Sequence, residues 1–128
     1  MGTRSTTTIY EGDTPLVTFY RQYDGYPSGH GAELAAYLDG AEIGNGIPGS
    51  GYAPKFFNGA GDLAFRLIAH FKPHDVPGSF YIVPTSHTDE EYNYRVYVVV
   101  GEPVLIAMDS DVPVKVTPAE FLAALVDA

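Results

Sequence analysis

The chain has 128 residues, and 45% of them are hydrophobic, which is enough for one domain with a buried core. Its net charge of −9 excludes a broad surface for nucleic-acid backbones, because such surfaces need clustered Lys and Arg. There is no cysteine, so disulfides, thiol catalysis and Cys-ligated metals are excluded. No apolar run reaches membrane-spanning length, and the first residues lack a signal-peptide core. We therefore expect a cytoplasmic protein without a membrane partner.

The first half of the chain predicts a hairpin followed by two helices. Residues 6–10 and 16–20 are β-branched and aromatic, with turn chemistry between them, which favours a β-hairpin. A glycine-rich connection then leads to a helix at residues 32–38. Glycine and proline predict an irregular segment over residues 41–57. A second helix, capped by Asn58, has apolar residues at three- and four-residue spacing and ends before Pro73.

The second half predicts further strands and a third helix. Strands are expected at residues 78–84, 92–100 and 104–108, and the last two form a second hairpin. A short edge strand is expected at residues 112–116, where Pro113 interrupts it. Thr117 and Glu120 form a capping box at the start of the final helix. The prediction is a single α+β domain over residues 1–128. Its antiparallel sheet has about five to six short strands, including two hairpins, and three helices lie mostly on one face.

The connection between the first hairpin and the first helix has the strongest functional pattern. Its glycines would let a ligand approach the backbone, and free N–H groups at the helix start, Ala32, would favour an anion. An arginine would add a bidentate contact, a histidine a pH-dependent one, and tyrosines would stack on a ring. The predicted ligand site comprises Arg21, Tyr23, Asp24, Tyr26, Gly29, His30 and Gly31. Alternatively, the stretch is structural, since Asp-Gly and Tyr-Pro are ordinary turn dipeptides.

Metal sites and catalytic groups have weaker support in the sequence. Two histidine groupings come into question: His70 with His74, and His30 or His87 with Asp24, Asp89 or Glu91. Pro73 should end the helix between the first two, and the second grouping lacks a ligand spacing typical of metal sites. Residues 89–91 are acidic and could pair for acid–base work, but a solvated loop is the simpler interpretation. We predict no catalytic residue, no metal and no other cofactor.

Two N-terminal motifs stand out beside these patterns, namely MGTRS at residues 1–5 and YRQYDGYPSGHG at residues 20–31. With them, the chain resembles a family of short uncharacterised proteins found in phages and prophages. The likeness continues through residues 45–47 and on through 63–64 to 70–72. The resemblance implies an accessory protein that acts inside an infected bacterium. Such proteins inhibit host proteins, or capture or degrade host nucleotide signals. It carries over no catalytic residue.

Three functions are compatible with these observations. We predict a non-enzymatic protein that binds an anionic, nucleotide-like small molecule at residues 21–32, in the context of countering host defence signalling, with a homo-oligomer interface as one setting for the site. One alternative is a hydrolase or phosphodiesterase that uses His30 and Asp24. The other is an acidic inhibitor of a host protein, in which residues 89–91 meet a basic surface. The expected partner is an anionic small molecule or a host protein, in the host cytoplasm if the chain is phage-encoded.

Overall fold

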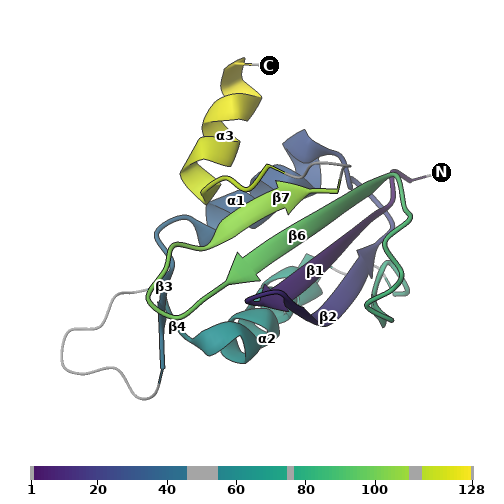
Figure 1. The fold of residues 1–128 in the computed structure, drawn as a ribbon. Coiled ribbons are helices and arrows are strands. Elements are labelled where there is room, and N and C mark those ends of the chain that lie inside the picture. Colours follow the sequence, from purple (N-terminus) through teal and green to yellow (C-terminus); the bar gives the residue numbers. More distant parts are fainter. Residues whose placement is uncertain (1, 46–54, 75–76, 110–113, 128) are drawn as a thin grey trace.

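The computed structural model describes residues 2–45, 55–74, 77–109 and 114–127 (Figure 1). The strands are β1 (Ser5–Glu11), β2 (Thr14–Arg21), β3 (Glu42–Gly44), β4 (Phe56–Asn58), β5 (Phe80–Val83), β6 (Tyr92–Val98) and β7 (Leu105–Met108). The α-helices are α1 (Ala32–Leu38), α2 (Gly59–Phe71) and α3 (Pro118–Asp127). A five-stranded sheet has the order β5-β2-β1-β6-β7, and β3 and β4 form a separate pair. The predicted α+β class with three helices is confirmed for the described residues.

The five-stranded sheet is mixed and mostly antiparallel, so the expected antiparallel sheet is confirmed only in part. The two predicted hairpins are present, because β1–β2 and β6–β7 are both antiparallel. However, β1 and β6 are parallel neighbours, in register from Ser5 opposite Tyr92 to Glu11 opposite Val98. The long connection through the helices returns the chain to the free side of β1 in the same direction, as parallel pairing requires. The hairpin patterns reveal nothing about this non-local pairing.

The segment predicted as irregular contains a small second sheet. β3 and β4 pair in parallel, and the residues 46–54 that separate them lie outside the described ones. Three-residue strands are too short to produce a readable alternation, which is why the sequence did not predict them. The expected strand at 112–116 falls partly outside the described residues. Its last residue, Val116, forms an antiparallel bridge with Ile106 of β7.

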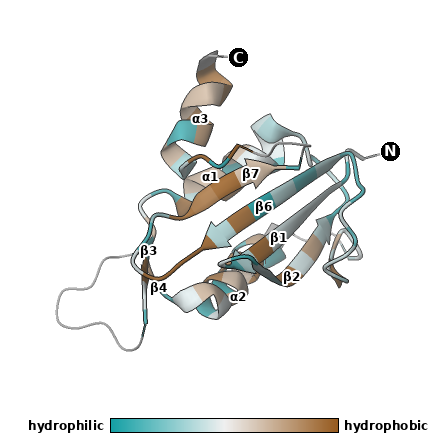
Figure 2. Ribbon diagram, in the orientation of Figure 1, coloured by the Kyte–Doolittle hydropathy of each residue, from teal (hydrophilic) through white to brown (hydrophobic). Residues whose placement is uncertain are grey.

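Alternation along the strands places one sheet face against the helices. In β6, Tyr94, Val96 and Val98 are all at most 2% exposed and belong to the hydrophobic core. Figure 2 shows β6 changing from hydrophilic residues in its first half to hydrophobic ones in its second half. Helix α2 contributes an apolar stripe to this core, and α1 and α3 pack against each other beside it. Alternate residues of β6 thus face the helices.

The opposite sheet face is polar and, among the described elements, carries no helix (Figure 1). Thr8 and Thr18 hydrogen-bond across β1 and β2 at 2.7 Å between hydroxyl oxygens. Thr6 donates to Asn93 of β6 at 2.6 Å. Stacked tyrosines flank this row, including Tyr10 with Tyr97 in β6 at 4.9 Å between centroids. The threonine hydroxyls are thus satisfied within the sheet, which explains how they are buried on an uncovered face.

The helix ends follow the sequence signals with one difference. At α3, the Thr117 hydroxyl accepts the Glu120 N–H and the Glu120 carboxylate accepts the Thr117 N–H, so the capping box is confirmed. Asn58 precedes α2 as predicted, but its side chain makes no cap hydrogen bond; instead Asp62 accepts the Asn58 backbone N–H at 2.8 Å. Helix α2 ends at Phe71, ahead of the proline. None of the helices within the described residues is long and apolar enough to cross a membrane.

Candidate functional site

Arg21 is the centre of the predicted ligand stretch, and the structure buries it. Its side chain is 9% exposed, and its guanidinium carbon lies 5.2 Å from the ring centroid of Phe80 and 5.9 Å from that of Phe71. Its Nη1 group donates to the Glu33 carboxylate of α1 at 2.6 Å. A weaker ion pair, at 4.0 Å, joins it to Asp24. Arg21 therefore connects β2 to α1 through internal contacts.

His30 lies beside Arg21 and is fully buried. The Arg21 guanidinium can only donate, so the His30 Nδ1 atom, at 3.2 Å, must accept. The proton of the neutral ring then sits on Nε2, which donates to the Thr7 hydroxyl of β1 at 2.7 Å. Burial, together with the positive charge of Arg21, lowers the pKa of His30 to about 3. Both ring nitrogens are thus engaged, and the ring is neutral at physiological pH.

The backbone amides of the glycines in the stretch, and those of His30 and Ala32, donate to carbonyl groups within the protein. The expectation of free N–H groups at the helix start is wrong, because a π-helical turn (Pro27–Gly31) precedes α1. Within it, Gly29 N–H donates to the Tyr26 carbonyl at 2.9 Å and His30 N–H to the Asp24 carbonyl at 2.8 Å. The first amide of α1, that of Ala32, donates to the Gly29 and Pro27 carbonyls. These amides therefore leave no anion site of the predicted kind.

The glycines of this stretch allow close packing of protein against protein. A Cβ atom on Gly25 would lie 2.7 Å from the Ser5 Cβ and 2.8 Å from a backbone oxygen. A Cβ atom on Gly31 would lie 2.9 Å from the Phe121 ring of α3. The Gly25 carbonyl also accepts the Tyr94 hydroxyl at 2.7 Å, and burial raises the pKa of that phenol. The glycine signal in the sequence thus marks sites where the main chain approaches other parts of the fold.

The Gly29→Ala variant tests this interpretation. A Cβ atom there would lie 2.6 Å from the Asp24 carbonyl oxygen and 2.9 Å from the Tyr26 ring. We expect a loss of about 1–3 kcal/mol in the free energy of unfolding, as is typical of overpacking. The control is Gly61→Ala in α2, where nothing lies within 4 Å and alanine should stabilise the helix by up to about 1 kcal/mol. Urea denaturation measures both, and an equal effect of the two substitutions would contradict close packing as the reason for Gly29.

The remaining predicted site residues lie at the surface of the same turn. Tyr23 is 49% exposed and Tyr26 is 38% exposed. Asp24 adopts a positive φ of 60° and accepts a long hydrogen bond, 3.3 Å, from the Tyr26 hydroxyl. Asp24 and His30 are close in the chain, but the Asp24 carboxylate is exposed and the His30 ring is buried. The geometry gives this pair no shared cavity in which to act on a substrate.

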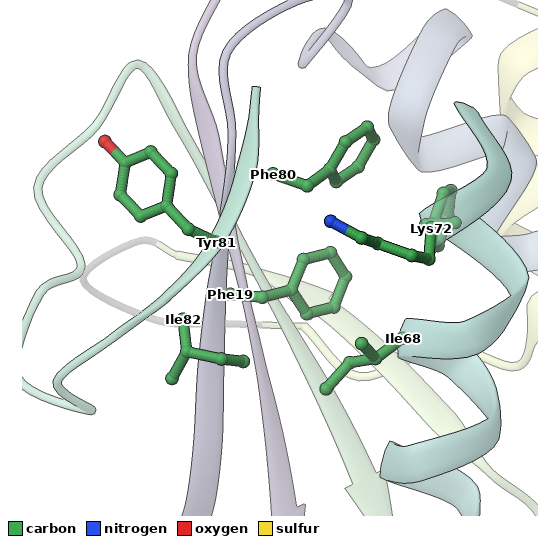
Figure 3. Close-up of a pocket in the computed structure, with 7 residues that line it drawn as sticks. Phe19, Ile68, Lys72, Phe80, Tyr81 and Ile82 are labelled. Carbon is green, nitrogen blue, oxygen red and sulfur yellow. The ribbon is translucent and has the colours of Figure 1, made fainter. Parts of the chain in front are cut away.

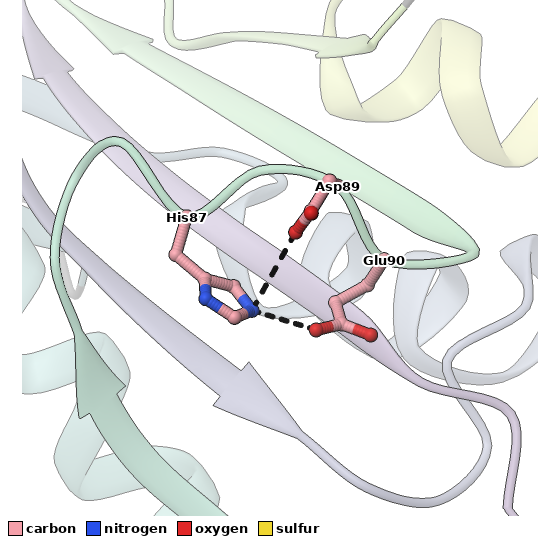
Figure 4. Close-up of side chains that lie close together, drawn as sticks. All are labelled: His87, Asp89 and Glu90. Atoms are coloured by element: carbon pink, nitrogen blue, oxygen red, sulfur yellow. Dashed lines mark hydrogen bonds and ion pairs between the residues drawn. The ribbon is translucent and has the colours of Figure 1, made fainter.

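A histidine and two carboxylates gather in the connection between β5 and β6 (Figure 4). The His87 Nε2 atom lies 2.6 Å from the Glu90 carboxylate and 3.8 Å from that of Asp89. The three donor atoms lie within 4.8 Å of one another. One imidazole nitrogen and two carboxylate oxygens suit a divalent cation. His87 packs edge-on against Tyr20, on the sheet face opposite His30, so those two histidines are not brought together. The His87–Glu90 contact satisfies both groups without a metal, so we assign none.

An apolar pocket lies between α2 and β5 (Figure 3). Its volume is about 220 Å³. It is lined by Phe19, Ile68, Phe71, Lys72, Phe80, Tyr81 and Ile82. The rings of Phe19 and Phe71 form a buried part of the wall, whereas Ile82 is 57% exposed at the rim. Lys72 extends from the end of α2 towards the rings of Phe80 and Phe19. The site is therefore an apolar hollow with one cationic group.

Sequence reasoning did not predict this pocket. Its residues come from three separate segments, and each is an ordinary apolar position of a strand or a helix. The available signal was the exposed pair Tyr81 and Ile82 in a short strand, which stands out only once that strand is known to be at the edge. Arg21 is behind the pocket wall, stacked on Phe71 and Phe80, rather than in the pocket.

The chain matches no protein-family model, no curated protein and no solved structure.

Proposed function

We propose that this chain is a non-enzymatic binding protein that holds a small anionic molecule in the pocket between α2 and β5. The observation that carries the proposal is the combination of an apolar hollow with the ammonium group of Lys72 over it (Figure 3). Pockets of this kind bind ligands through buried apolar area, and a few polar groups fix the orientation. The predicted class of ligand, an anion with a ring, is kept, while the location differs from residues 21–32.

The size of the pocket limits the ligand. A cavity of about 150 Å³ accommodates one benzene ring, and this one measures about 220 Å³. Drug-sized ligands occupy roughly 300–1,000 Å³. We therefore propose a single ring system, or an aliphatic group of similar size, that carries a carboxylate or phosphate. Of a nucleotide, the base would enter and the remainder would lie outside.

Binding is favoured over catalysis by the chemistry of the lining. Among the described residues that form the pocket, Lys72 and Tyr81 are the ones with titratable side chains. A nucleophile next to a general base, the usual arrangement for hydrolysis, is not found among these residues. The histidine of the hydrolase alternative, His30, is buried with both nitrogens bonded. A bound ligand would therefore leave the pocket unchanged.

The test is a titration with 3-phenylpropanoate and its uncharged amide, followed by NMR of backbone amides. We expect the anion to bind with a dissociation constant on the order of a millimolar, as suits a ligand of this size, and the amide to bind several-fold more weakly. Lys72→Gln should remove the difference between the two ligands. The matched control is Arg66→Gln, also on α2, whose guanidinium pairs with Asp62 and does not line the pocket.

A second variant tests the location. Ile68→Trp should fill the hollow and abolish binding of both ligands, because the added ring would occupy the same space. Unchanged affinity in Ile68→Trp would contradict the proposed site. Failure of both ligands to bind the unaltered protein would contradict the proposed function itself.

A further inference from the structure

We propose that Arg21 determines which rings this pocket prefers, without touching the ligand. Its guanidinium lies behind the aromatic wall, and from there it favours electron-rich rings, such as phenols and alkoxybenzenes, over electron-poor ones. This inference rests on the proposed function and names the class of ring that the same site takes.

The guanidinium of Arg21 lies against two rings of the pocket wall from outside the pocket. Its central carbon is 5.2 Å from the ring centroid of Phe80 and 5.9 Å from that of Phe71. Both phenylalanines line the pocket, whereas Arg21 does not. The two rings are stacked at 6.0 Å between centroids, so one cation acts on both. A cation at such a distance over a ring attracts the π electrons of that ring.

The charges around Arg21 leave the two rings in a positive field. The Arg21 side chain is 9% exposed, whereas the carboxylates paired with it are far more exposed, at 50% for Glu33 and 61% for Asp24. Water therefore screens the negative charges more strongly than the positive one. His30, which also contacts the guanidinium, accepts with a neutral ring and adds no negative charge.

The electron distribution of benzene rings explains why this field produces a preference. Such a ring has a negative face and a positive edge. The guanidinium draws the π electrons of Phe71 and Phe80 towards itself, so their faces towards the pocket become less negative and their edges more positive. An electron-rich ligand ring packs more favourably against such a wall, whether it meets the faces or the edges of the two rings. The hollow is apolar, so water screens this effect little.

Two other cations help to isolate the effect of Arg21. Lys72 extends towards the ring of Phe80 as part of the pocket lining (Figure 3). It is kept in every variant, so its contribution is common to all of them. Arg66 offers the matched control, because its guanidinium carbon lies 5.9 Å from the ring centroid of Phe57, and that ring does not line the pocket.

The experiment compares 3-phenylpropanamide with its 3,4,5-trifluorophenyl counterpart, whose ring face is electron-poor, by NMR titration of backbone amides. Both ligands are uncharged. The measured quantity is the dissociation constant of the fluorinated ligand divided by that of the unfluorinated one, because general losses of affinity cancel in this ratio. We expect Arg21→Met to lower the ratio about twofold, as suits a cation that acts through an intervening ring. Glu33→Gln removes a carboxylate that opposes the guanidinium and should raise the ratio, whereas Arg66→Met should leave it unchanged.

The opposite directions of the two changes separate this role from a purely structural one. A pocket distorted by either substitution would bind both ligands more weakly and leave the ratio unchanged. An unchanged ratio in Arg21→Met, or a lowered one in Glu33→Gln, would overturn the inference, and binding of 3-phenylpropanoate would then leave the proposed function standing. If Arg21→Met does not fold, the ratio in Glu33→Gln decides alone, and anything but a rise overturns the inference. If the unaltered protein binds neither 3-phenylpropanoate nor the two amides, both proposals fail.

Discussion

The free energy of unfolding should fall steeply when the pH drops below about 6.5, because the fold buries His30 as a neutral ring. The pKa of His30 is lowered from 6.5 to about 3 in the folded state. Between these values the unfolded chain binds one proton more than the folded protein does. Stability is therefore fully present above pH 6.5 and is lost as the pH falls towards 3, at about 1.4 kcal/mol per pH unit.

The groups around His30 strengthen this expectation. Arg21, a permanent cation, faces Nδ1, and the Thr7 hydroxyl faces Nε2. The rings of Phe71 and Tyr94 pack at 4.9 and 5.3 Å between centroids, and burial raises the pKa of Tyr94, so it too stays neutral. None of these groups can accept a hydrogen bond from the additional N–H of a protonated His30 ring unless the structure rearranges.

The measurement is a series of urea unfolding curves between pH 7 and pH 5, where most carboxylates remain ionised. His30→Gln retains an acceptor for Arg21 and a donor for Thr7. It should lower the slope of the free energy of unfolding against pH by the contribution of about one proton. His70→Gln is the control, because His70 is exposed and stacked on Tyr37. A slope that is unchanged in His30→Gln would contradict the buried neutral ring.

Arg21→Ala should lower the free energy of unfolding by about 2–4 kcal/mol. The substitution removes charge-assisted hydrogen bonds to Glu33 and His30, worth about 1.5–3 kcal/mol for bonds to charged groups. It also removes the buried stem and the stacking on Phe80 and Phe71. Because the Glu33 side chain is 50% exposed, water can solvate the carboxylate that is left, which keeps the loss below that of a fully buried pair.

Arg66→Ala is the matched control for this prediction. Arg66 is 56% exposed and pairs with Asp62 one turn earlier in α2, so its loss should cost no more than about 1 kcal/mol. Chemical denaturation gives both values. Similar small losses for the two arginines would show that Arg21 does not hold β2 to α1. In that case a ligand role for the guanidinium would become the better explanation of its place in the sequence.

The sequence predicted the elements of this fold better than their pairing. Local signals, such as the capping box at Thr117 and the alternation from Tyr92, define single helices and strands. Pairing of β1 with β6 depends on residues 87 positions apart, such as Thr6 and Asn93, and no local pattern encodes it. The strands β3 and β4 were not predicted, because three residues are too few for a periodicity.

The candidate site was harder to predict, because the same residue types occur both in anion-binding sites and in closely packed turns. Glycines next to an arginine and a histidine are typical of an anion site, yet here Gly25 and Gly31 allow close packing against Ser5 and Phe121. Only the carbonyl partners of the amides distinguish the two cases. The pocket between α2 and β5 depends on which strand lies at the sheet edge, and this is a property of the topology rather than of any motif.

The parallel pairing of β1 with β6 has a consequence for synthesis on the ribosome. The β1–β2 hairpin can form as soon as β2 has emerged. The other neighbour of β1 is β6, in which Tyr92 lies opposite Ser5, and β6 is synthesised much later. Until β6 has emerged, β1, which is the central strand of the finished sheet, is an edge strand. Contacts between distant segments form late and leave nascent chains prone to association. A chain interrupted before residue 92 would thus lack β6 and could not complete the sheet and the core.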